Sequence, residues 1–176
     1  NDIRFSECGS EMFTCGNDGF VAHFKLSGPQ KWTLISRFKA STGSSVEGVA
    51  SLLVLPSSSP NAPSRILTAS CKLRLWNLAS KAKGWELHQT YSGHSGQITH
   101  LSLARSDDGS LYALSSSDSE NDRIVSLWRM PAAESKENGH HLAENNNSET
   151  AVANFAVNDD VKSFATRFGS DRVILS

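Results

Sequence analysis

Short β-prone runs, and not long amphipathic stretches, carry most of the apolar residues of this chain. No window of helical length keeps apolar residues at i, i+3, i+4 and i+7, so we expect at most a turn or two of helix. Typical runs cover residues 12–15, 65–69 and 111–115, and turn formers such as Gly16-Asn17-Asp18-Gly19 follow them. The pattern therefore predicts an all-β fold built from short strands and tight turns.

An internal repeat organises these runs. The nonamers at 18–26, 70–78 and 122–130 align without gaps and place aromatic side chains at Phe24, Trp76 and Trp128. The spacing is constant, since 76 − 24 = 52 and 128 − 76 = 52. Because a β-prone run and a turn precede each nonamer, every copy is predicted to form a hairpin.

Further β-prone runs bring the number of predicted strands in each repeat to four. Residues 32–38 and 46–55 precede the second hairpin, and residues 85–91 and 97–104 precede the third. One four-stranded sheet cannot bury both of its faces alone, so sheets repeated at a fixed period must stack on one another. That arrangement is typical of β-propeller blades, and the fixed period argues against an ordinary β-sandwich.

The third repeat resembles a WD repeat. Gly93-His94 stands before a strand, Asp122 lies in the predicted tight turn, and Trp128 ends the following strand. The second copy has Ser70 in place of the turn aspartate. This resemblance to WD repeats implies a β-propeller.

The length limits how much of a propeller the chain can form. Dividing 176 by 52 gives about 3.4 repeats, whereas propellers close with about four to eight blades. We therefore expect residues 1–176 to form a partial propeller of about three and a half four-stranded blades, a fragment of a larger ring. Residues 131–150 are polar and are predicted to be a flexible loop insertion.

Composition excludes several function classes. The net charge of −1 and the pI near 6.6 provide no chain-wide field for nucleic acid or an anionic membrane. The longest apolar stretch, 49–55, is far shorter than the roughly 20 residues of a membrane span. Three cysteines without a CxxC pair indicate a reducing intracellular compartment.

Three residues of the third repeat have the types needed for nucleophilic catalysis, namely His94, Ser115 and Asp122. No nucleophile elbow surrounds the serine, which argues against a hydrolase. The WD resemblance implies instead that these residues and Trp128 form a hydrogen-bonded chain that locks the blade. The same resemblance assigns structural roles to matching residues of the other copies, which are Thr14, Asp18, Thr68 and Trp76. We therefore expect no catalytic residue, no cofactor and no small-molecule substrate.

His140-His141 is the single histidine pair of the sequence. Adjacent residues of a strand point to opposite sides, and no cysteine or further histidine stands at ligand spacing. No metal site is predicted there.

The succession of features resembles one branch of the WD-repeat family, the nucleolar proteins of the small-subunit processome. The segments that carry this resemblance are 13–20, 67–76, 91–98, 111–128 and 152–161. It implies a non-enzymatic scaffold in the nucleolus, bound to other WD-repeat processome proteins and serving ribosomal RNA transcription and processing.

The basic side chains leave the mode of RNA contact open. Small groups such as Arg37 with Lys39, and Lys72 with Arg74, could contact pre-ribosomal RNA directly, or the RNA could be held through partner proteins. The alternative function is a substrate receptor or adaptor of a ubiquitin ligase, or another protein-interaction platform.

Overall fold

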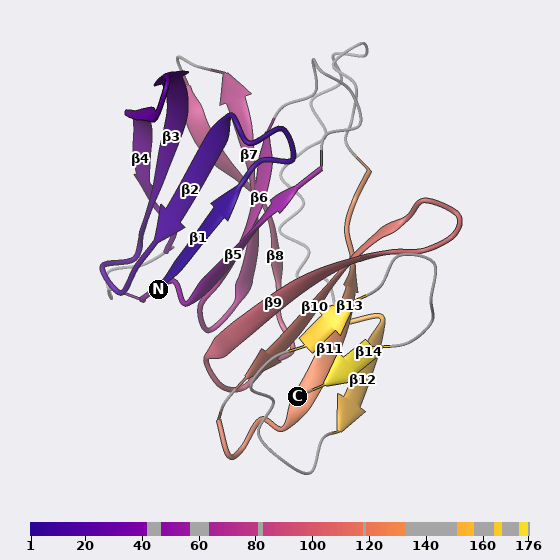
Figure 1. Cartoon of the computed structure of the whole chain (residues 1–176). Helices are drawn as coiled ribbons and strands as arrows, with labels where there is room; N and C mark the ends of the chain where they lie inside the picture. The colour runs from indigo at the N-terminus through magenta and orange to yellow at the C-terminus, as the bar shows by residue number, and fades with distance from the viewer. Residues whose placement is uncertain are drawn as a thin grey trace.

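The computed structural model describes residues 1–41, 47–56, 64–80, 83–117, 119–132 and 151–156, together with the backbone of 164–166 and 173–175. These residues form an all-β structure without a helix, as predicted. Three four-stranded antiparallel sheets and one two-stranded hairpin make up the fold (Figure 1). No helix of the described part is long and apolar enough to cross a membrane.

Each four-stranded sheet is a simple meander, in which consecutive strands are neighbours. The first sheet contains β1 (Asp2–Phe5), β2 (Glu11–Cys15), β3 (Phe20–Gly28) and β4 (Lys31–Lys39). The second contains β5 (Ser51–Leu55), β6 (Arg65–Ala69), β7 (Leu73–Ser80) and β8 (Gly84–Tyr91). The third contains β9 (Ile98–Arg105), β10 (Leu111–Ser117), β11 (Ile124–Arg129) and β12 (Ala153–Ala156), and the hairpin contains β13 (Phe164–Thr166) and β14 (Val173–Leu175).

The sheet boundaries fall one strand later than the sequence repeat suggested. The run 32–38, grouped above with the second hairpin, pairs with β3 as the outer strand of the first sheet. The run 85–91 pairs in the same way with β7. Because short turns connect these outer strands to the strand before them, each joins the preceding sheet.

The first strand of each sheet contacts the first strand of the next sheet. β5 contacts β1 on one side and β9 on the other, and β9 also contacts β13. The second sheet therefore lies between the first and the third (Figure 1).

This position explains the nearly continuous apolar sequence of β5 and β6. Leu52 and Ile66 belong to a buried cluster shared with the first sheet, whereas Leu53 and Leu67 belong to a cluster shared with the third. Strands buried on both faces need apolar residues at successive positions, not at alternate ones. Each such aliphatic side chain contributes about 1.5–3 kcal/mol by leaving water.

One face of the first sheet has no sheet against it in the described structure. Register places Phe5, Met12, Phe24 and Leu34 in one row across that face. Phe5 is 54% exposed and Leu34 is 53% exposed, and Ile3 on the same face is 58% exposed. The aromatic of the first repeat therefore lies on a face that remains open.

The predicted loop insertion 131–150 and the pair His140-His141 lie outside the described residues, except for Pro131 and Ala132.

Candidate functional site

A buried chain of side-chain hydrogen bonds lies in the third sheet. His94 lies in the segment before β9, and Asp122 lies in the turn before β11. Their side chains are 0% and 3% exposed, and 3.0 Å separates His94 Nδ1 from Asp122 Oδ2. The amide of Gly96 also donates to Asp122 Oδ2, at 2.9 Å. One carboxylate oxygen thus holds the segment before β9 at two points.

The chain continues into the sheet through Ser115 on β10 and Trp128 on β11. Ser115 Oγ lies 2.8 Å from His94 Nε2, and Trp128 Nε1 donates to the same Oγ at 2.7 Å. The carboxylate accepts from Nδ1–H, and in the tautomer with that proton Nε2 accepts the Ser115 hydroxyl proton. With this tautomer every donor has an acceptor, and the chain consists of the four residues His94, Ser115, Asp122 and Trp128.

The distances among Ser115, His94 and Asp122 match those of a nucleophilic triad. However, Ser115 is 0% exposed, and its hydroxyl is already shared between an indole and an imidazole. A nucleophile must reach the carbonyl carbon of its substrate, which this burial prevents. In this geometry the three side chains connect β10, the turn before β11 and the segment before β9.

Gly93 is required by the same packing. A Cβ atom added to Gly93 would lie 2.9 Å from Cη2 of the Trp128 ring, closer than real Cβ contacts. The residue before His94 must therefore lack a side chain for the indole to reach Ser115.

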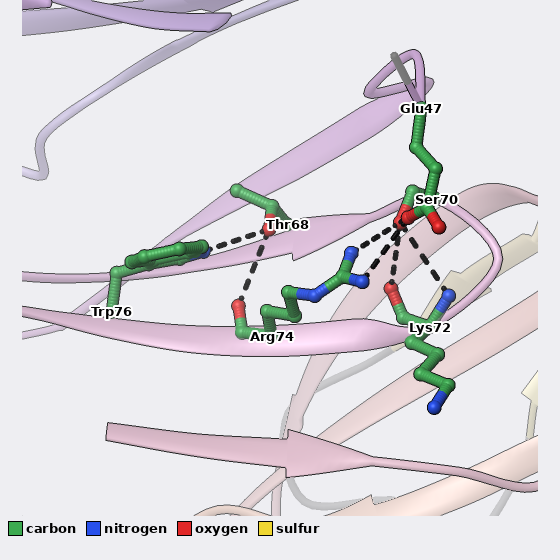
Figure 2. Close-up of polar contacts among 6 residues, drawn as sticks. All are labelled: Glu47, Thr68, Ser70, Lys72, Arg74 and Trp76. Carbon is green, nitrogen blue, oxygen red and sulfur yellow. Dashed lines mark hydrogen bonds and ion pairs between the residues drawn. The ribbon is translucent and has the colours of Figure 1, made fainter. Parts of the chain in front are cut away.

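In the second sheet, Thr68 and Trp76 repeat one link of this chain (Figure 2). Trp76 Nε1 donates to Thr68 Oγ1 at 2.9 Å, and that hydroxyl lies 3.4 Å from the Arg74 carbonyl oxygen. Both residues were assigned to the structural network from the sequence.

An ion pair occupies the place of the histidine and aspartate in the second sheet (Figure 2). Arg74 is 3% exposed, and its guanidinium donates to Ser70 Oγ at 2.7 Å and to Glu47 Oε2 at 3.1 Å. Ser70 Oγ itself lies 3.3 Å from Glu47 Oε2. Glu47 thus holds the segment before β5 against the second sheet, as His94 holds the segment before β9 against the third sheet.

Sequence reasoning missed Glu47 and assigned Arg74 to a small basic group with Lys72. The signal for burial was present, because Arg74 stands between two leucines and ahead of Trp76 in a strand without other charges. A buried guanidinium paired with a carboxylate is not available to RNA. That basic group therefore offers only the exposed Lys72.

In the first sheet the structure does not bring Thr14 and Asp18 together. Asp18 is 55% exposed at its side chain and pairs with Arg37 Nη2 at 2.7 Å. The amide of Phe20 and the Arg37 guanidinium lower the pKa of Asp18. Thr14 points to the open face, where Phe24 has no N–H to donate. Thr14 and Asp18 therefore do not share a hydrogen-bonded chain in the described residues.

A buried histidine near the first sheet–second sheet boundary also escaped the sequence analysis. His23 is 2% exposed and stacks on Phe13, with 4.5 Å between the ring centroids. Its Nε2 lies 3.5 Å from Glu11 Oε1, and this contact is the main cause that lowers the pKa of Glu11. Trp85 of β8 meets both rings edge-on, so the group joins two sheets.

Within the described ranges, no three His, Cys, Asp or Glu residues lie close enough to hold a metal ion.

Comparison with known proteins does not identify the chain. No protein-family model matches the sequence, and no curated protein matches it.

Proposed function

We propose that this chain is part of a WD-repeat β-propeller that acts as a non-enzymatic scaffold for protein assembly. The observation that carries the proposal is the succession of like sheets through their first strands, β1, β5, β9 and β13. First strands arranged side by side are typical of propeller blades around a central axis.

The direction of stacking supports the same architecture. The face that carries Trp76 packs on the first sheet, and the face that carries Trp128 packs on the second. Phe24 occupies the corresponding place on the open face of the first sheet. A further blade would bury that face as the first two sheets bury the others.

The polar chemistry supports a scaffold over an enzyme. The groups with catalytic potential in the third sheet are buried and hydrogen-bonded to one another. Groups used in this way stabilise the blade, and a rigid propeller presents its rims and edges to partners.

Sequence resemblance supplies the proposed assembly. The segments given above favour the small-subunit processome, with other WD-repeat proteins as partners and pre-ribosomal RNA in the same particle. Nucleolar localisation follows from this proposal.

The test is purification of the tagged full-length protein from its own cells at mild salt, with bound proteins and RNA identified. We expect other propeller proteins together with precursor ribosomal RNA, and a nucleolar signal in fluorescence microscopy. Ubiquitin-ligase subunits without precursor RNA would instead support the adaptor function. A protein confined to the cytosol would refute the nucleolar assignment.

A further inference from the structure

We draw no further inference here: the strongest candidate, the open apolar face of the first sheet on which Ile3, Phe5 and Leu34 are exposed, carries none because nothing in the described structure shows what covers it beyond a further blade of the proposed propeller.

Discussion

Asp122→Ala tests whether the buried chain of the third sheet stabilises the fold. The substitution removes the acceptor for His94 Nδ1 at 3.0 Å and for the Gly96 amide at 2.9 Å. Hydrogen bonds to a charged group contribute about 1.5–3 kcal/mol each, and the lost donors are buried. We expect the free energy of unfolding to fall by about 3–5 kcal/mol. At about 2–4 °C per kcal/mol, the Tm should fall by roughly 10 °C.

The assay is thermal unfolding of the full-length protein followed by circular dichroism. Asp18→Ala is the matched control, because that carboxylate is 55% exposed and both of its contacts, with the Arg37 guanidinium and the Phe20 amide, lie at the exposed surface. An exposed pair contributes about 0–1 kcal/mol, so the control Tm should barely change. Equal Tm values for the two variants would refute the structural role of the chain.

Three further predictions concern other parts of the first and third sheets. Cys8 should react with iodoacetamide at pH 7 far faster than buried Cys15, because hydroxyl groups lower the pKa of Cys8 to about 7 and burial raises that of Cys15 to about 11. Peptide mass mapping measures both reaction rates, and equal rates would contradict this prediction. The pKa of Glu11 is lowered in the folded state, so its contribution to stability is present above its unfolded pKa and is lost as the pH falls through the folded pKa. Glu11→Gln should therefore flatten the plot of Tm against pH in that acidic range. An unchanged plot would count against the contact between Glu11 and His23. Gly93→Ala should lower the Tm by several degrees through its contact with Trp128, and a wild-type Tm would show that the ring can move aside.

Local sequence features predicted most of the strands. β6 was predicted at 65–69 and is observed as Arg65–Ala69, because apolar runs and turn formers act over a few residues. The hydrogen-bonded chain of the third sheet was also predictable, since the resemblance fixed the positions of His94 and Trp128.

Features that depend on contacts between distant segments were not predictable. Glu47 reaches Arg74 from a connecting segment 27 residues away, and no spacing rule links an acidic residue there to a strand arginine. The bulge at Ile35 depends on the register between two strands, which a one-residue insertion changes without altering composition. The sheet boundaries followed from turn lengths, which the 52-residue period does not reveal.

In the second sheet, loss of the Glu47 charge and loss of the Arg74 charge should lower the stability by different amounts. Glu47 is 30% exposed at its side chain and can be hydrated when Arg74→Met removes its partner, whereas Arg74 is 3% exposed and cannot. Removing one partner of a buried ion pair costs about 3–5 kcal/mol when the remaining charge stays buried, and the cost is smaller when the remaining charge can be hydrated. We therefore expect Glu47→Gln to lower the Tm more than Arg74→Met does. The double variant should resemble Arg74→Met alone, since the burial cost of the guanidinium is then absent. Equal effects of the two single variants would mean that Ser70 alone satisfies the buried arginine and that the carboxylate does not lock the blade.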